Sequence, residues 1–553
     1  MLKVVLRKLF GGWSPLFASD PDLNLAPDPD PVSALPLLSL DPLQSLRMLA
    51  SEFRWSELEM QAKELLTNRP DADEALALVA FGLQQQGQFE EAVVVCKQAY
   101  SIDPSRWLTN FVAGVALKAL GRIEEACKYL HQAAVIAPED SQTARLLMQT
   151  RIVVDGIESA VAEYRAHCVR LGREGRVVEA PIQSVCEWFI QRGLSIQKAG
   201  EAEEIPFEAP AVWGRAAEST CVTVTSNQPY VVEIPDAQIF SRSSLILTRD
   251  NCVLSDTAGH PELGQFVSLA YESVVVCQQP GRVALDFEDY QICKIPAGIW
   301  LSGLASNAFG HWLPEFLPKL QFLRQHPSFN SLPIIVDDEM PPSHMAHLRR
   351  LVDNPVIILP AKTSFVCERL LVAPSPTFFP VDLLQNNIPE YRIGALSPRA
   401  LRFLRERVPV GPEKRGGRIF LGRKTMKWRR LLNEDEISRY LSSVGFETVY
   451  IEDMTAEQQI ILFQGAEWIV APNGSSILNL IFSNPAAKIL ILTQNNLFNW
   501  GNFQGPMSAL GYSPVFVCGE ESAAIDQKHA DYQVPLKLVQ QVLTAMDLKE
   551  AEV

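Results

Sequence analysis

A histidine and a carboxylate stand four residues apart where an apolar run leads into a predicted helix. They are His311 and Glu315, and the run before them reads GIWLSGL. Residues with this spacing share one face of a helix. A histidine beside a carboxylate at a strand-to-helix junction can act as the general base that takes a proton from a hydroxyl group. The same pattern also fits a helix that packs its histidine and Trp312 against a sheet, so both interpretations stay open.

Basic residues crowd one short segment of a chain whose formal net charge is -15. The segment follows the predicted strand GRIFLG and contains Arg423, Lys424, Lys427, Arg429 and Arg430. A loop at the carboxyl end of a parallel strand is well placed to bind a diphosphate, and arginine can do so through paired hydrogen bonds. The alternative is a solvated loop with counter-charges nearby, and some of these five residues are expected only to favour solubility.

A glycine–serine turn lies between a predicted strand and a short predicted helix. It contains Asn473, Gly474, Ser475 and Ser476 within the run VAPNGSSILNLIF. The N-terminus of a helix offers free N–H groups and the positive end of the helix dipole, which favour a phosphate. The two serines are equally suited to cap the helix and nothing more.

Three acidic residues, Asp337, Asp338 and Glu339, follow the apolar run IIV. Their oxygen atoms are suitable ligands for Mg²⁺ or Mn²⁺. A helix that begins after them, with acids near its N-terminus, is the more common reason for such a pattern.

Other enzyme signatures are missing from the sequence. His260, His326, His344 and His347 are scattered, and the chain has no HExxH, G-x-S-x-G, Walker A or GxGxxG pattern. Hydrolase, zinc-protease, ATPase and simple dehydrogenase functions lose support accordingly.

Composition bounds the class of protein. At 553 residues, the chain is long enough for roughly three to four domains. The chain as a whole is negatively charged and lacks the excess of basic residues that is typical of nucleic-acid-binding proteins. The ten cysteines form no CxxC pair, which fits a cytoplasmic location. No run approaches the ~18 apolar residues of a membrane helix, and the basic start MLKVVLRKLFGGW predicts at most peripheral contact with the inner face of a membrane.

A 34-residue repeat organises the N-terminal third. Gly87, Ala92, Ala99 and Pro104 recur 34 positions later as glycine, alanine, alanine and proline. Each copy reads as two helices separated by glycine, and small alanines let paired helices approach closely. We expect helical repeats over 45–200, with a helix over 176–200 closing the array. Residues 1–44, rich in proline and aspartate, are expected to be disordered or draped over the surface.

The remainder of the chain is predicted to be α/β. Short β-rich runs follow residue 205, and strands alternate with helices in the last 140 residues or so, which implies a parallel sheet with right-handed crossovers. Asn433 with Glu436, and Thr455 with Gln458, have the spacing of capping boxes. Gly445 is expected to end the helix that begins after Asn433.

Taken together, these patterns resemble two known families. The repeats resemble the tetratricopeptide repeat, whose period and small-residue pattern match. The remainder is similar to glycosyltransferase family 61 over about 230–520. The matching residues are Asn307, His311, Trp312, Glu315, Leu317, Pro318 and Leu320, then Arg423, Arg430, Asn433 and Glu434, and finally Gly474, Asn479, Leu480 and Phe482.

The second resemblance implies an inverting, metal-independent enzyme of the two-Rossmann-domain (GT-B-like) type. Residues 205–400 would form the acceptor side and 401–553 the Rossmann-like side that binds a nucleotide-sugar. His311 or Glu315 would be the catalytic base. The donor would be contacted by Arg423, Lys427, Arg430, Asn433, Glu434, Asn473, Gly474, Ser475, Ser476 and Asn479.

The function expected from this resemblance is sugar transfer from a nucleotide-sugar to a glycan or protein, in polysaccharide biosynthesis by analogy with the family. No cofactor is expected, and the repeats would recruit the acceptor or a protein partner. One position departs from the family, which usually has His-Gly where this chain has Asn473-Gly474. Because asparagine cannot accept a proton at neutral pH, a non-catalytic scaffold with a degenerate transferase domain is the alternative. A metal-dependent transferase that uses Asp337 and Asp338 is a third, weaker hypothesis.

Overall fold

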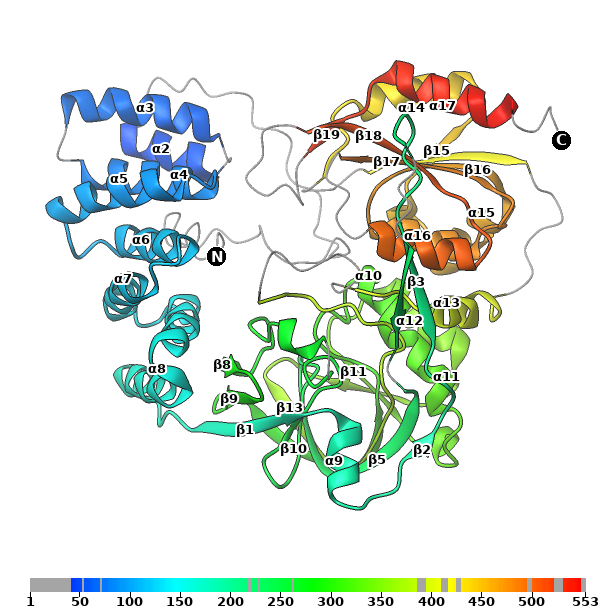
Figure 1. Cartoon of the computed structure of the whole chain (residues 1–553), viewed down its shortest axis with the longest axis horizontal. Coiled ribbons are helices and arrows are strands. Elements are labelled where there is room, and N and C mark those ends of the chain that lie inside the picture. The colour runs from blue at the N-terminus through cyan, green and yellow to red at the C-terminus, as the bar shows by residue number, and fades with distance from the viewer. Residues whose placement is uncertain are drawn as a thin grey trace. The chain divides into compact units, whose positions relative to one another are not determined.

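The computed structural model of the chain forms two compact units (Figure 1). The described part of the first unit lies within residues 41–180 and 274–288, and that of the second within 181–273 and 289–548. The described residues are 41–51, 54–69, 72–216, 221–226, 228–260, 263–384, 394–408, 416–423, 429–494, 500–521 and 531–548. No helix among them is long and apolar enough to cross a membrane. Residues 1–44 were expected to be disordered or draped over the surface. Of these, residues 1–40 lie outside the described residues.

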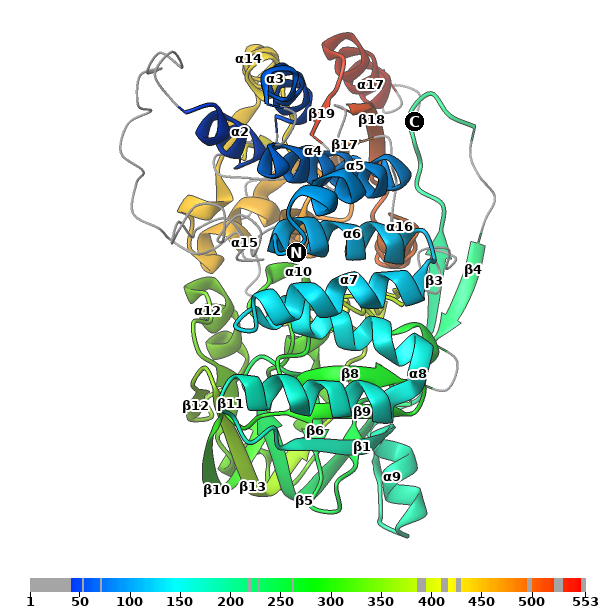
Figure 2. The same ribbon diagram turned by 90° about the vertical axis from the view of Figure 1, so that its left-hand side faces the viewer.

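The first unit is an array of helices that stack one upon the next (Figure 2). The helices are α2 (Pro42–Ser51), α3 (Trp55–Asn68), α4 (Asp73–Gln85), α5 (Phe89–Ile102), α6 (Trp107–Ala119), α7 (Ile123–Ile136) and α8 (Ser141–Arg170). Gly87 and Gly121 separate the paired helices with a φ of 75° at both positions, a conformation that glycine adopts without steric cost. Gly156, with a φ of 80°, interrupts α8 in the same way. The helical repeats expected from the sequence are therefore present.

Small residues allow the close helix packing of this array. Ala92, Ala99, Ala126 and Ala133, which occupy matching positions in the two clear repeats, are all 0% exposed. Gly114 in α6 has the same role, because a Cβ atom there would lie 2.5 Å from Cγ of Leu130 in α7. Larger side chains at these positions would force the helices apart.

A β-hairpin, and not a further helix, closes the array. The helix expected over 176–200 is wrong in its first part, where β1 (Val177–Gln183) contains the β-branched run VV. The hairpin comprises β8 (Val275–Gln279) and β9 (Arg282–Asp286). The Asp286 carboxylate accepts hydrogen bonds from the Tyr164 hydroxyl at 2.6 Å and from Arg173 at 2.9 Å. Glu288 accepts three backbone N–H groups, from residues 174–176. These charge-assisted hydrogen bonds attach the hairpin to the end of the helical array.

The first sheet of the second unit begins with four parallel strands. Its order is β12-β11-β10-β13, followed by the antiparallel strand β5 and then β6, β7 and β1. The strands are β2 (Gln197–Lys198), β5 (Tyr230–Phe240), β6 (Ile246–Leu247), β7 (Val253–Leu254), β10 (Gln291–Trp300), β11 (Ile334–Asp337), β12 (Val356–Leu359) and β13 (Thr363–Val372). Strands β3 (Glu204–Glu208) and β4 (Cys221–Thr225) form a separate hairpin. Helices α9 (Val185–Gln191), α12 (Pro342–Leu351) and α13 (Pro398–Arg405) complete this part.

The segment after β10 is a succession of irregular helical turns. It comprises α10 (Phe309–His311), the π-helical turn η3 (Trp312–Phe316), the 3₁₀ turn η4 (Leu317–Lys319) and α11 (Leu320–Leu323). Pro314 and Pro318 supply no backbone N–H, which prevents a regular α-helical ladder here. π-helical turns of this kind are frequent at functional sites.

The second sheet is a doubly wound parallel sheet. Its order is β15-β14-β16-β17-β18-β19, in which only β19 is antiparallel to its neighbour. Its strands are β14 (Gly417–Leu421), β15 (Glu447–Val449), β16 (Ala466–Pro472), β17 (Lys488–Gln494), β18 (Val515–Glu521) and β19 (Tyr532–Gln533). Its helices are α14 (Glu434–Ser443), α15 (Ala456–Gly465), the 3₁₀ helix η8 (Ser475–Phe482), α16 (Trp500–Ala509) and α17 (Leu536–Leu548). The predicted alternation of strand and helix is confirmed.

Helix ends in this part follow the expected chemistry with one exception. Thr455 and Gln458 form the predicted capping box. Gly445, with a φ of 88°, ends α14, and the next N–H, that of Phe446, bonds the Leu441 carbonyl oxygen at 3.0 Å. The capping box expected at Asn433 was wrong, because its side chain makes no cap hydrogen bond and instead bonds both the N–H and the carbonyl oxygen of Val534.

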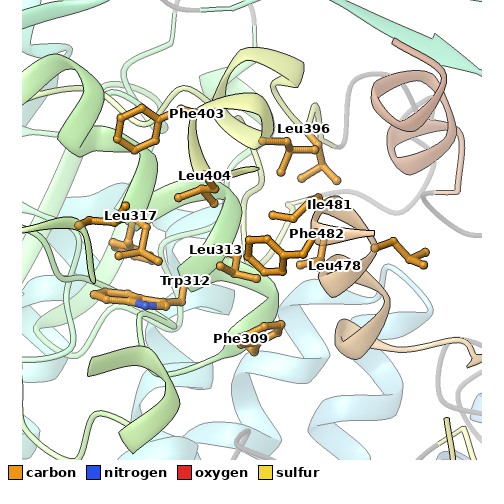
Figure 3. Packing of buried hydrophobic residues seen from close by; sticks show 14 of the residues in the cluster. Phe309, Trp312, Leu313, Leu317, Leu396, Phe403, Leu404, Leu478, Ile481 and Phe482 are labelled. Carbon is orange, nitrogen blue, oxygen red and sulfur yellow. The ribbon is translucent and has the colours of Figure 1, made fainter. Parts of the chain in front are cut away.

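One hydrophobic core joins the two sheets of the second unit. Side chains from the turns after β10 and from η8 pack against α13 in this core (Figure 3). The expected boundary at residue 401 falls within α13. The labelled members of the core are Phe309, Trp312, Leu313, Leu317, Leu396, Phe403, Leu404, Leu478, Ile481 and Phe482. The turn that carries His311 is therefore held in place by hydrophobic contacts with both η8 and α13.

Buried carboxylates anchor the loop between β10 and α10. Asp337 accepts hydrogen bonds from the hydroxyls of Ser302 and Ser306, the latter at 3.1 Å, and from the backbone N–H of Arg242 at 2.9 Å. Glu272 accepts the N–H of Ser244 at 2.8 Å, and Ser244 Oγ accepts the N–H of Leu304 at 2.9 Å. These bonds hold the loop that leads into the His311 turn.

The acidic residues at the end of β11, Asp337, Asp338 and Glu339, bond to other groups of the protein. Asp338 accepts the backbone N–H of Ala361 at 2.7 Å, and Arg242 pairs with both Asp338 and Glu339. With Asp337 bound to serines, the three acids point to separate partners. Within the described residues no group of three histidine, cysteine or acidic side chains is arranged to hold a metal ion.

A matched pair of glycines tests the helix packing of the repeats. We expect Gly114→Ala to destabilise the first unit by about 1–3 kcal/mol, because the new methyl group overlaps a buried leucine. Gly82→Ala is the control, since its Cβ would meet Trp55 at an ordinary 3.4 Å. That variant is expected to be neutral or more stable by about 0.5–1 kcal/mol through helix propensity. Urea unfolding followed by circular dichroism measures both, and equal effects would contradict the packing argument.

The loop anchor predicts a pH dependence of stability. Burial, with a smaller contribution from Asp337, raises the pKa of Glu272 to about 7. A raised folded-state pKa means that the stability contribution is complete below the unfolded value, near 4.3, and is lost as pH rises through 7. We expect Glu272→Gln to remove this loss. Between pH 5 and pH 8, wild type should lose up to about 3 kcal/mol more unfolding free energy than the variant, as measured by urea unfolding. The same pH dependence in both proteins would contradict the assignment.

Candidate functional site

His311 and Glu315 form a contact on the irregular turns after β10. His311 Nδ1 faces Glu315 Oε1 within hydrogen-bond distance, and their side chains are 17% and 15% exposed. The ring of Phe379 lies 5.3 Å from the His311 ring, and Ser375 Oγ donates to the Glu315 carbonyl oxygen at 3.4 Å. The predicted proximity of the two side chains is therefore present, in a half-buried position.

A third charged group continues this row at the same spacing. Lys319, four residues after Glu315, places its ammonium 5.1 Å from the centroid of the Phe316 ring. Burial lowers the pKa of Lys319, and the carboxylates of Asp256 and Glu315 oppose that effect. Asp256 is partly buried and accepts a hydrogen bond from the Tyr230 hydroxyl. Sequence reasoning did not single out Lys319, although its position eight residues after His311 was a readable signal.

The other predicted group meets at the ends of β14 and β16. Arg423, just after β14, donates from Nη1 to the Asn473 carbonyl oxygen at 2.8 Å. Its backbone N–H bonds Glu434 Oε1 at 3.0 Å. Gly474 lies directly beneath the guanidinium, because a Cβ atom there would be 2.7 Å from Arg423 Nη2. Four predicted donor residues, from three separate segments, are thus brought together.

The strand order explains why these ends are a suitable binding position. Strand β15 lies on one side of β14, and β16 lies on the other. The chain leaves β14 toward β15 and leaves β16 toward β17, so the two connections diverge at the carboxyl ends of β14 and β16. In doubly wound sheets, ligands bind at this topological switch point. Arg423 and the 473–476 turn lie at it.

The His311–Glu315 pair and the Arg423–Gly474 group come close to each other at Gly310, the residue before His311. A Cβ atom built on Gly310 would lie 3.5 Å from Cβ of Ser475, the first residue of η8. Ser475 and Ser476 are partly exposed, whereas Gly474 is buried. The candidate base and the candidate anion site are therefore neighbours within the second unit.

Several predicted donor residues make contacts within the protein. Arg430 forms an ion pair with Asp531 at 2.6 Å, and Asn433 binds the backbone of Val534. Asn479 is fully buried and donates to Gln459 at 3.2 Å. Gln459 in turn bonds the carbonyl oxygens of Ile451 and Met454, which fixes the loop after β15. Lys427 lies outside the described residues.

Asn473, the position that departs from the expected family pattern, is 1% exposed. Its Nδ2 donates to Thr493 Oγ1 at 3.1 Å, and its Oδ1 has no hydrogen-bond partner among the described residues. Its side chain is directed into the sheet, and its carbonyl oxygen holds Arg423. The contribution of Asn473 to the site is thus made by the backbone.

The histidines of α12 pack beneath the His311 turn. Trp312 donates from its indole nitrogen to the His344 carbonyl oxygen at 3.2 Å, and the two rings stack at 5.6 Å. His347 stacks on Phe482 of η8 at 5.9 Å. Burial lowers the pKa of His344 to about 4 and that of His347 to about 3. Both imidazoles are neutral at physiological pH and act as packing groups.

Comparisons with known proteins agree with this division of the chain. Residues 309–490 match the family model of Glycosyltransferase 61, and residues 83–149 match a Tetratricopeptide repeat model. The first match begins at Phe309 and includes both clusters described above. No curated protein matches the chain.

Two solved structures show the extent of similarity to known folds. MamA (41-end) from Desulfovibrio magneticus RS-1 is 17% identical with a TM-score of 0.22, over 23% of this chain and 75% of that one. The pilF protein of Pseudomonas aeruginosa is 18% identical with a TM-score of 0.22, over 23% and 59%. By the two family-model matches alone, the chain contains a glycosyltransferase family 61 domain over residues 309–490 and a tetratricopeptide repeat over residues 83–149.

Proposed function

We propose that the second unit transfers a sugar from a nucleotide-sugar to a hydroxyl group of a glycan or protein acceptor. The observation that carries this proposal is the proximity of two different groups. A half-buried His311–Glu315 pair lies on one side. On the other, at the switch point of a doubly wound sheet, lies Arg423, whose guanidinium donates to the backbone oxygens of Arg429 and Asn473. Deprotonation of an acceptor and stabilisation of a leaving diphosphate require these two capacities together.

The chemistry follows from the geometry. With the Nδ1 proton of His311 donated to Glu315, Nε2 carries the lone pair that takes the proton of the acceptor hydroxyl. The acceptor oxygen forms a bond to the anomeric carbon, and the bond from that carbon to the diphosphate breaks. The leaving diphosphate keeps the electron pair, and Arg423 and the N–H groups of the 474–476 turn stabilise its charge. A single displacement of this kind inverts the anomeric configuration and needs no metal.

The two sheets would then serve as the two halves of a GT-B-like enzyme. Residues 205–400 would bind the acceptor, and 401–553 would bind the donor. Asn473 is buried and holds Arg423 through its backbone carbonyl oxygen. Because any residue has this oxygen, the role does not require a histidine at position 473. The alternative remains a scaffold that binds a nucleotide without turnover. In either function the repeats would recruit a protein partner or the acceptor. The cytoplasmic location stays a prediction.

The donor site makes the first prediction of this proposal. A nucleoside diphosphate that binds the folded chain should raise its melting temperature by linkage. We expect a rise with one nucleotide of a panel of nucleoside diphosphates and nucleotide-sugars. The rise should be unchanged by EDTA, and loss of the shift in EDTA would favour the metal-dependent alternative. No shift at millimolar concentration with any nucleotide would contradict the donor site and favour the scaffold.

The base makes the second prediction. We expect His311→Ala to lower kcat/KM for sugar transfer by about 100- to 10,000-fold, as removal of a general base does. Glu315→Gln should lower it less, because the amide still contacts the imidazole. Donor binding, measured by calorimetry, should change by less than about threefold in both, since neither side chain touches the diphosphate.

His326→Ala is the matched control, since His326 accepts the N–H of Ser328 in a turn after α11. That variant should retain wild-type activity. Full turnover by both His311→Ala and Glu315→Gln would remove the pair from the base role.

A further inference from the structure

Arg429 has an unusual backbone conformation beside Arg423. Its φ is 54°, in the left-handed region that non-glycine residues rarely adopt. Its carbonyl oxygen accepts a hydrogen bond from Arg423 Nη1 at 3.2 Å. Residues held in such conformations are concentrated at ligand-binding positions, where the surrounding structure compensates the strain. The bond from Arg423 therefore fixes Arg429 at the end of β14.

The side chain of Arg429 is partly buried, and no described residue supplies a counter-charge bonded to it. Its Nε is inaccessible to solvent and has no hydrogen-bond partner in the part of the chain that the structure describes. Burial, with a smaller contribution from the neighbouring charge of Arg423, lowers the pKa of Arg429 to about 10. The contrast with Arg430 is direct, because that next residue is exposed and bonds Asp531.

Two guanidinium groups therefore share a partly buried position, and no carboxylate among the described residues forms an ion pair with either side chain. The nearby charges of Glu434 and Glu452 act on Arg423, but Glu434 bonds the backbone N–H of Arg423 and not its guanidinium. Burying like charges together is costly unless an anion compensates them. A diphosphate fits, because it carries at least two negative charges and several oxygens that accept paired arginine hydrogen bonds.

We infer that Arg429, and not the Arg430 expected from the sequence, is the second arginine that binds the diphosphate of the donor. This inference rests on the proposed function, since it assigns a residue of the same donor site. Arg423 and Arg429 would bind the anion together, and Arg430 would fix the loop through Asp531.

Substitution of the two adjacent arginines tests the inference. The probes are inorganic pyrophosphate and the nucleoside diphosphates of the panel, with binding measured by calorimetry on the full chain. We expect Arg429→Met to weaken binding by about 30-fold or more, as loss of charge-assisted hydrogen bonds does. Arg430→Met, the matched control, should bind within about threefold of wild type.

A stability measurement without ligand separates a binding role from a structural one. Because Arg429→Met removes an uncompensated buried charge, we expect the ligand-free melting temperature to stay the same or rise by about 1–3 °C. A residue that merely stabilises the fold would lower it. Arg429→Lys keeps the charge without the planar fork, and it should bind with about five- to tenfold weaker affinity. That variant tests the inference should the methionine variant not fold.

The possible outcomes are distinguishable. Equal binding by wild type and Arg429→Met would overturn the inference and leave the proposed function standing. Equal losses in Arg429→Met and Arg430→Met would also overturn it. If wild type binds neither pyrophosphate nor any nucleoside diphosphate, the inference and the proposed donor site both fail.

Discussion

The packing of the turns after β10 against η8 is the contact on which the candidate site depends. Phe309, Trp312 and Leu313 lie on one side, and Leu478, Ile481 and Phe482 lie on the other, in one core that joins the two sheets. His311 is carried by the first of these segments, and the 473–476 turn leads directly into the second. Because both are held by the same buried side chains, their relative position follows from hydrophobic packing, with no need for a bond between the polar groups themselves.

Buried charge is distributed unevenly over the second unit, and this distribution separates support from binding. Asp337 and Glu272 are buried with hydroxyl and N–H donors around them, so they anchor the loop before His311. Arg423 bonds only backbone oxygens through its side chain, and Arg429 has no such compensation. Groups whose charge is satisfied within the protein serve the fold, whereas a cation left without a partner is available to an anionic ligand.

The repeat array uses a different principle, in which backbone proximity replaces polar contacts. Alanines and Gly114 allow the helices to approach, and the array is closed by a hairpin from residues 274–288, far along the sequence. Asp286 accepts hydrogen bonds from Tyr164 of the last helix and from Arg173, and Glu288 accepts those of the backbone N–H groups just after that helix. The array therefore depends on a segment that lies, in sequence, between the strands β7 and β10 of the second unit.

The sequence by itself determined the features that depend on local chemistry. A 34-residue period, glycines between helices, the capping box at Thr455 and the alternation of strands with helices are local patterns, and so is the spacing of His311 and Glu315. The strand at 177–183, the closing hairpin and the ion pair of Arg430 with Asp531 were decided only by tertiary structure. These features depend on which distant groups lie nearby. Asp531 pairs with Arg430, and contacts between residues about 100 positions apart leave no signal in the spacing of one sequence.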